Sequence, residues 1–76
     1  MIPITEYSPR RALEVERLSL DGRAARRLRE LGVIPGSRLR VLARAPLGDP
    51  ILIFVGGSRI AVRGNIASRI LVRRAE

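Results

Sequence analysis

Residues 31–63 read LGVIPGSRLRVLARAPLGDPILIFVGGSRIAVR, and this stretch decides the fold. It contains three short segments in which apolar residues recur, at 37–44, 51–55 and 58–63, separated by residues that favour turns. In the first segment, apolar residues such as Leu39 alternate with arginines, and this period of two is typical of a strand with one buried face. We therefore predict consecutive short strands joined by tight turns.

The second segment, residues 51–55, is apolar at every position. We expect such a strand to be buried on both faces, as a central strand of a sheet is. The Gly-Gly pair at 56–57 suits a two-residue hairpin turn, because such turns require the left-handed conformations that glycine adopts. The next strand is then 58–63, with Ile60 and Val62 facing inward.

The segment before this stretch is predicted to contain one strand and one helix. Residues 12–20 alternate apolar and charged side chains, as a strand does. Asp21 can cap a helix over 22–31, because its carboxylate can accept the free N–H groups of the first turn. Gly32 can supply the left-handed residue that commonly ends a helix. The apolar stripe of this helix has the spacing i, i+4, i+7 and consists of Ala24, Leu28 and Leu31.

The segment after it completes the predicted element order. Residues 66–68 are predicted to form one helical turn and residues 69–73 the last strand, with Ile70 and Val72 inward. The chain is thus mainly β with one helix. Short antiparallel strands favour a small closed or nearly closed barrel, because closure removes exposed strand edges. We expect one domain spanning 1–76, and periodicity alone leaves an SH3-like and an OB-like barrel open.

Composition excludes several classes of function. The chain has fifteen basic residues, all arginine, and seven acidic residues, which gives a net charge of +8; it has no histidine and no cysteine. A Cys/His zinc site, a thiol nucleophile and a Ser-His-Asp triad are therefore excluded. We predict that the protein is not an enzyme and has no catalytic residue, cofactor or metal site. No apolar run approaches the ~20 residues needed to span a bilayer, and no secretion signal is recognisable, so we expect a cytoplasmic location.

Two motifs at a fixed separation carry a family resemblance. They are LGVIPG at 31–36 and APLGDP at 45–50, followed by IAVR at 60–63 and by Ile70 and Val72 two residues apart. Together they resemble the FeoA family. The resemblance implies an SH3-like β-barrel.

The resemblance also implies a function. It indicates a small cytoplasmic accessory protein of ferrous iron uptake that docks on the cytosolic GTPase part of the membrane transporter FeoB and modulates it. The chain itself lacks the GxxxxGK[ST] motif of a GTPase. The same module occurs as the C-terminal domain of iron- and manganese-dependent repressors, which leaves a detached repressor domain as an alternative.

A third interpretation is a basic barrel that binds nucleic acid through phosphate contacts, without reading sequence. The chain has only two aromatic residues, Tyr7 and Phe54, and we expect Phe54 to be buried. Because single-strand binders use several exposed stacking rings, we expect no specific nucleic acid partner. Contact with a membrane is expected only through the transporter. A homo-oligomer is an open alternative, because an unpaired strand edge in a small domain invites a partner.

Two acidic residues of the first predicted strand, Glu14 and Glu16, lie on one face of it. Two carboxylates can ligate a hard cation, but they do not form a complete cage, and fifteen arginines are available as partners. We therefore expect ion pairs at these positions.

The loop at 45–50 is the predicted partner-binding surface. Its two prolines restrict the chain, so an apolar residue between them can be presented to a partner at a low cost in conformational entropy. Arginines on the preceding strand can grip carboxylates with two hydrogen bonds. The predicted set comprises Pro46, Leu47, Gly48 and Asp49 of the loop, with Arg44 foremost among the arginines and then Arg38 and Arg40.

We predict that the protein binds transition metals only weakly. Its carboxylates offer oxygen ligands alone, whereas Fe²⁺ and Zn²⁺ sites usually include imidazole or thiolate. Titration calorimetry with Fe²⁺ or Zn²⁺ is expected to show no sub-micromolar affinity. A sub-micromolar site would contradict this prediction.

Overall fold

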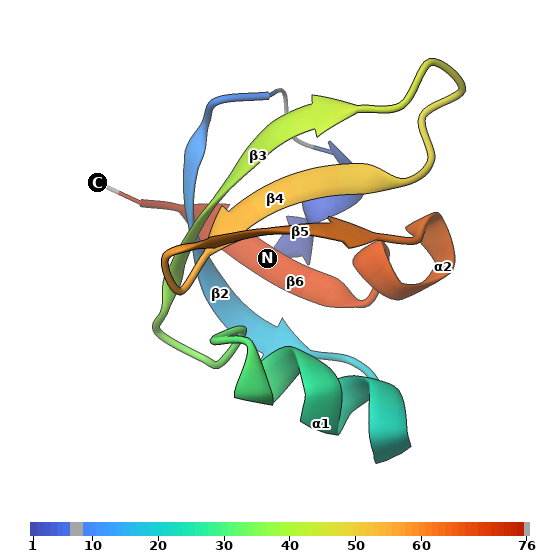
Figure 1. The fold of residues 1–76 in the computed structure, drawn as a ribbon. Coiled ribbons are helices and arrows are strands. Elements are labelled where there is room, and N and C mark those ends of the chain that lie inside the picture. The colour runs from blue at the N-terminus through green and yellow to red at the C-terminus, as the bar shows by residue number, and fades with distance from the viewer. Residues whose placement is uncertain (7–8, 76) are drawn as a thin grey trace.

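The computed structural model describes residues 1–6 and 9–75. Its elements, in chain order, are β1 (Ile2–Pro3), the 3-10 helix η1 (Ile4–Glu6), β2 (Ala12–Leu18), α1 (Gly22–Glu30), β3 (Arg38–Arg44), β4 (Ile51–Val55), β5 (Ser58–Val62), α2 (Gly64–Ala67) and β6 (Ile70–Arg74). The strands of this part of the chain form one antiparallel six-stranded sheet in the order β1-β6-β2-β3-β4-β5. The sheet is strongly curled, and α1 lies at one end of it (Figure 1).

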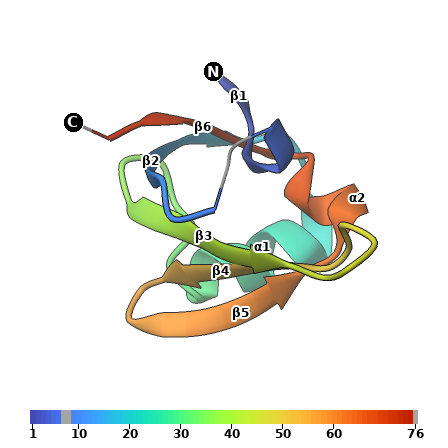
Figure 2. The ribbon, with the colours of Figure 1, turned by 90° about the horizontal axis from the view of Figure 1, so that it is seen from above.

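The inner face of this curled sheet forms most of the core. Seen from above, β6 and β2 lie on the opposite side of the core from β4 and β5, and β3 crosses between them (Figure 2). No polar or charged side chain is buried among the described residues. Because the core is entirely apolar, its stabilisation comes from removing hydrocarbon surface from water. Its largest fully buried side chains are Ile4, Leu13, Val15, Val33, Val41, Ile51, Ile53, Val55, Ile70 and Val72.

The predicted order of strands and helices is confirmed from residue 12 onward, and the N-terminus adds two elements that were not predicted. β1 pairs with β6 through Ile2 opposite Val72, and η1 buries Ile4 in the core. A strand of two residues is too short to show an alternating pattern, so the sequence alone carries no signal for it.

The prediction that 51–55 is buried on both faces is wrong. Ile51, Ile53 and Val55 face the core, whereas Leu52 is half-buried and Phe54 is 44% exposed. β4 is paired on both edges, with β3 and β5, but the sheet is a single layer. Because so short a chain has little material for a second layer, the outer face of β4 stays in contact with solvent.

The helix prediction is partly correct. Leu28 is buried as expected, but the other buried residue of α1 is Ala25, and Ala24 and Leu31 are only half-buried. Asp21 stands at the N-cap position with an extended backbone, but its side chain makes no capping hydrogen bond.

Gly32 ends the helix as predicted. Its φ is +103°, and the N–H of Val33 donates to the carbonyl oxygen of Leu28 at 2.9 Å, a closure typical of a helix that ends in a left-handed residue. This residue also allows a close approach of two backbones. A Cβ on Gly32 would lie 3.3 Å from the Cα of Gly56, and a Cβ on Gly56 would lie 2.7 Å from the carbonyl oxygen of Leu31. The end of α1 thus packs directly on the β4–β5 turn.

We predict that Gly56→Ala destabilises the protein more than Gly57→Ala does. Both glycines have a positive φ, +61° and +80°, so alanine at either position carries the strain of a left-handed residue, ~1–2 kcal/mol. Only at Gly56 does the added Cβ also meet backbone; at Gly57 it meets no atom within 4 Å. Urea denaturation should therefore give the lower unfolding free energy for Gly56→Ala, and equal values for the two variants would show that the contact is not required.

Candidate partner-binding surface

The loop between β3 and β4 is closed by its own backbone. The N–H of Gly48 donates to the carbonyl oxygen of Ala45 at 2.7 Å, and the N–H of Ala45 donates to the carbonyl oxygen of Pro50 at 3.0 Å. Pro46 stands at the second position of the resulting turn, where its fixed φ is favourable. The Asp49–Pro50 peptide bond is cis. The two backbone hydrogen bonds give the loop a defined shape.

Leu47 is the most exposed of the large apolar side chains in the described residues. It lies at the third position of the turn, and 96% of its surface is accessible to solvent. In Figure 1 the loop extends beyond the body of the curled sheet at the end of β3. The expectation that Leu47 is exposed at a loop tip is confirmed, so this side chain contributes nothing to the core.

Asp49 ties the loop to the rest of the fold. Its Oδ1 accepts a hydrogen bond from the N–H of Gly64 at 2.9 Å, at the first residue of α2. The two segments are in close contact, because a Cβ on Gly64 would lie 3.1 Å from Oδ2 of Asp49. From the sequence, Asp49 was expected to be one of four loop residues at the partner surface. Its bond to a residue fifteen positions away has no local sequence signal.

The three predicted arginines do not lie on one surface. Arg38 and Arg40 alternate with the buried Leu39 and Val41 and so lie on the outer face of the sheet. The pairing of β3 with β4 then shifts between Val41 and Ala43, where a bulge adds one residue. One extra residue reverses the alternation.

Arg44 is consequently paired with the buried Ile51, on the inner side of the sheet at the base of the loop, and is itself half-buried. It is the one arginine of the three that lies next to the loop. Arg38 stands at the other end of β3, about 20 Å away along a strand of seven residues.

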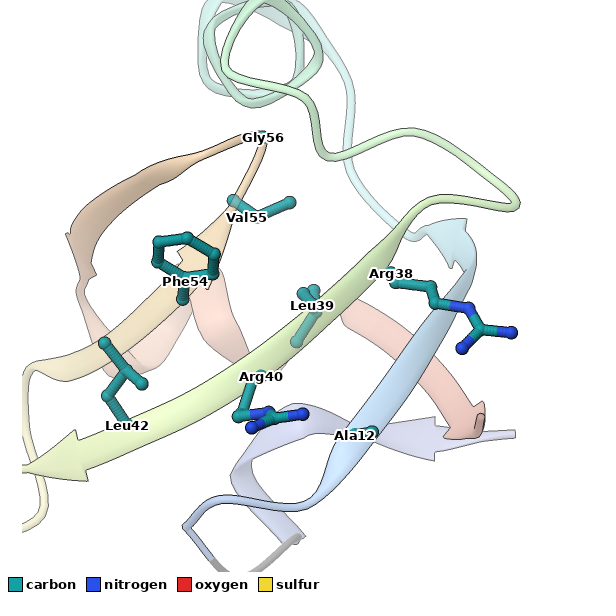
Figure 3. A pocket seen from close by; sticks show the side chains of 8 residues that line it. All are labelled: Ala12, Arg38, Leu39, Arg40, Leu42, Phe54, Val55 and Gly56. Atoms are coloured by element: carbon teal, nitrogen blue, oxygen red, sulfur yellow. The ribbon is translucent and has the colours of Figure 1, made fainter. Parts of the chain in front are cut away.

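Arg38 and Arg40 instead border an open hollow on the outer face, with a volume of about 430 Å³ (Figure 3). We call it the Phe54 hollow after its aromatic wall. Sequence reasoning missed Phe54 as a surface residue because the apolar run around it indicated burial on both faces. The side chains that line the hollow include Ala12, Arg38, Arg40, Leu42 and Phe54.

The expected ion pairing of the acidic strand residues is found at Glu14. Its Oε2 accepts a hydrogen bond from Nη2 of Arg73 at 2.8 Å. This hydrogen bond, and then the negative charges of Glu14 and Glu16, raise the pKa of the Arg73 guanidinium above its ordinary value. Arginine is charged over the whole working pH range in any case, so the pair keeps its positive partner. Within residues 1–6 and 9–75, no three acidic side chains gather as a metal site would require.

We predict that Asp49→Ala destabilises the protein by about 1 kcal/mol or less, because the lost hydrogen bond is exposed to solvent. Asp49→Asn provides the matched control, because its amide oxygen can still accept the Gly64 N–H. Thermal melting should place the asparagine variant nearer to the parent than the alanine variant. If the two variants have the same melting temperature, below that of the parent, the loss of stability comes from the missing carboxylate charge and not from the missing hydrogen bond.

Comparison with known proteins places the chain in a family. The model of the FeoA domain matches residues 2–74. No curated protein sequence matches the chain. No helix in the described part of the chain is long and apolar enough to cross a bilayer.

Several solved structures are similar to it, among them the following three. Iron(II) transport protein A of Clostridium thermocellum is 29% identical with a TM-score of 0.90; the match covers 96% of this chain, which spans only 45% of the length of that protein. The zinc complex of FeoA from Stenotrophomonas maltophilia, described as a prokaryotic SH3-domain protein, is 35% identical over 96% of this chain and 91% of that one, with a TM-score of 0.81.

The third is the IdeR protein of T. acidophilum, which is 23% identical over 97% of this chain and 34% of that one, with a TM-score of 0.83. This third likeness shows the fold alone.

The expectation of a small SH3-like fold, mainly β with one helix, is confirmed by the curled sheet and by the Stenotrophomonas relative. The match over residues 2–74 shows that the chain belongs to the FeoA family, whose members are associated with ferrous iron transport.

Proposed function

We propose that the protein is a cytoplasmic, non-catalytic accessory of ferrous iron uptake that docks on the cytosolic GTPase domain of a FeoB-type transporter and modulates it. The docking surface is the loop formed by Pro46, Leu47, Gly48 and Asp49, with Arg44 at its base. The observation that carries this proposal is the 96% exposure of Leu47 at the tip of a loop that the chain itself holds in shape.

The shape of the loop favours binding. A flexible loop loses conformational entropy when it is ordered by a partner, and a loop already held in place avoids most of that cost. Here the turn bond to Ala45 and the bond from Gly64 to Asp49 hold both sides of the tip. Burying a leucine side chain fully in a partner's pocket would contribute ~1.5–3 kcal/mol.

The net charge of the protein also supports docking on another protein. The net charge of +8 produces a positive field that attracts an acidic partner surface. Arg44 adds a guanidinium at the base of the loop. The chain has no histidine, cysteine or GTPase motif, so any hydrolysis of GTP takes place in the transporter, and this protein acts by binding.

A second candidate function is that of a repressor domain, which the shared fold with IdeR favours. In that case the partner of the loop would be the DNA-binding domain of a metal-dependent repressor. Binding of the isolated chain to the GTPase domain distinguishes the two functions, because the repressor interpretation predicts none.

We predict that Leu47→Ala weakens binding to the soluble GTPase domain about fivefold or more, which corresponds to ~1 kcal/mol or more. The melting temperature should stay close to that of the parent, because the side chain is outside the core. Affinity is measured by titration calorimetry, and the rate of GTP hydrolysis with each variant tests the modulation.

The matched control is Ile34→Ala, which removes another exposed apolar side chain, 45% accessible, in the turn between α1 and β3. It should bind the GTPase domain as the parent does. Equal affinities for parent and Leu47→Ala, or an equal loss in the Ile34 control, would contradict the assignment of the loop.

A further inference from the structure

A row of paired residues crosses the outer face of four adjacent strands. Ala12 of β2 is opposite Arg40 of β3, Arg40 is opposite Phe54 of β4, and Phe54 is opposite Arg59 of β5. Side chains that face each other across strands lie close together on one face. The phenyl ring therefore lies between two arginines, with the small side chain of Ala12 at the end of the row.

The Phe54 hollow lies along this row. Figure 3 shows Phe54 and Leu42 on one side of β3 and Arg38, Arg40 and Ala12 on the other. The ring is 44% exposed, although its strand is paired on both edges. The small Ala12 leaves space beside Arg40, and the resulting volume of about 430 Å³ lies within the ~300–1,000 Å³ typical of ligand sites.

The two charged residues directly beside this ring in the row, Arg40 and Arg59, are both positive. Arg38, Arg40 and Arg59 are exposed, and none of their side chains makes a hydrogen bond or ion pair with another described residue. The nearest acidic position in the pairing, Glu14 opposite Arg38, already binds Arg73.

The spacing of these arginines is that of neighbouring groups on a short, bound ligand. Neighbouring strands lie ~4.8 Å apart, so the Cα atoms of Arg40 and Arg59 are separated by about 10 Å, with the ring between them. Arg38 lies two residues along β3 from Arg40, about 7 Å away. A ligand that satisfies this arrangement has an apolar group at its centre and a negative charge on either side.

We propose that the Phe54 hollow, with Arg59 beside it, binds an acidic protein segment in which one apolar side chain is flanked by carboxylates. The apolar side chain packs against Phe54 and Leu42, and the guanidinium groups bind carboxylates with two hydrogen bonds each. Arginine and aromatic residues are the types enriched at protein interfaces. This surface is separate from the loop of Leu47 and does not depend on the function proposed for that loop.

A protein segment fits these observations better than a nucleic acid does. Proteins that bind single strands stack successive bases on several aromatic rings along a basic groove. Here one ring stands in the row, and its neighbour in the hollow is the aliphatic Leu42. The surface thus offers one apolar contact between charges.

The test is an NMR titration of the full chain with a synthetic peptide in which a leucine is flanked on both sides by glutamates. The parent should bind it, with shift changes in β3 and β4. Phe54→Ala and Arg40→Gln should each weaken binding about tenfold. The parent protein should bind two altered peptides about as weakly as the variants bind the original one. One altered peptide has glutamine in place of glutamate, and the other has alanine in place of leucine. Melting curves verify that both protein variants fold.

Two control variants test whether the loss of peptide binding is specific to the Phe54 hollow. Arg29→Gln removes one charge from an exposed position of α1, and Leu47→Ala removes the most exposed large apolar side chain of the described residues; both should bind the peptide as the parent does. Failure of the parent to bind, parent-like binding by Phe54→Ala and Arg40→Gln, or loss of binding in Leu47→Ala would overturn the proposal. Tighter binding of a single-stranded oligothymidine, lost in Phe54→Ala, would also overturn it in favour of a nucleic acid site.

Discussion

One sheet has to supply most of the hydrophobic core of this protein. Since no second layer covers it, the sheet curls until its inner face packs against itself, and the alternating apolar residues of its strands become the core. The same constraint leaves the outer face uncovered. The exposed position of Phe54 therefore follows from the architecture, as do the positions of the arginines beside it.

Two contacts fix the segments around this sheet. The close approach of Gly32 and Gly56 holds the end of α1 on the β4–β5 turn. On another part of the fold, the bond from Gly64 to Asp49 holds the exposed loop against α2. Ala67 of that helix is fully buried. Besides its direct connection to β3 and β4, the loop is thus linked to the core by a hydrogen bond to a short helix, which makes its position specific although its tip is in solvent.

Much of the fold could be predicted from the sequence because most strands follow the period of two. Strand β3 shows this, with Leu39 and Val41 buried and their neighbouring arginines exposed. The uniform apolar run of β4 misled the interpretation, because hydrophobicity alone does not reveal whether a second layer exists. Strand β1 was missed because two residues carry no pattern.

The candidate site was less predictable than the fold. The exposure of Leu47 follows from turn-forming neighbours, which is a local property. The separation of Arg44 from Arg38 and Arg40 depends on a bulge near Leu42, and the role of Asp49 depends on a distant partner. Neither the pairing register nor a long-range contact is encoded in a short window of sequence, so these features required the three-dimensional structure.

We propose that the 45–50 loop is the docking surface for the transporter's GTPase domain. The most direct measurement is a map of backbone amide shifts of the labelled chain as the unlabelled GTPase domain is added. The account predicts that the amides of Leu47, Gly48 and Asp49 change most and that Gly64, bonded to Asp49, changes with them. Changes confined to the sheet edges at β1 and β5, with the loop amides unmoved, would contradict it.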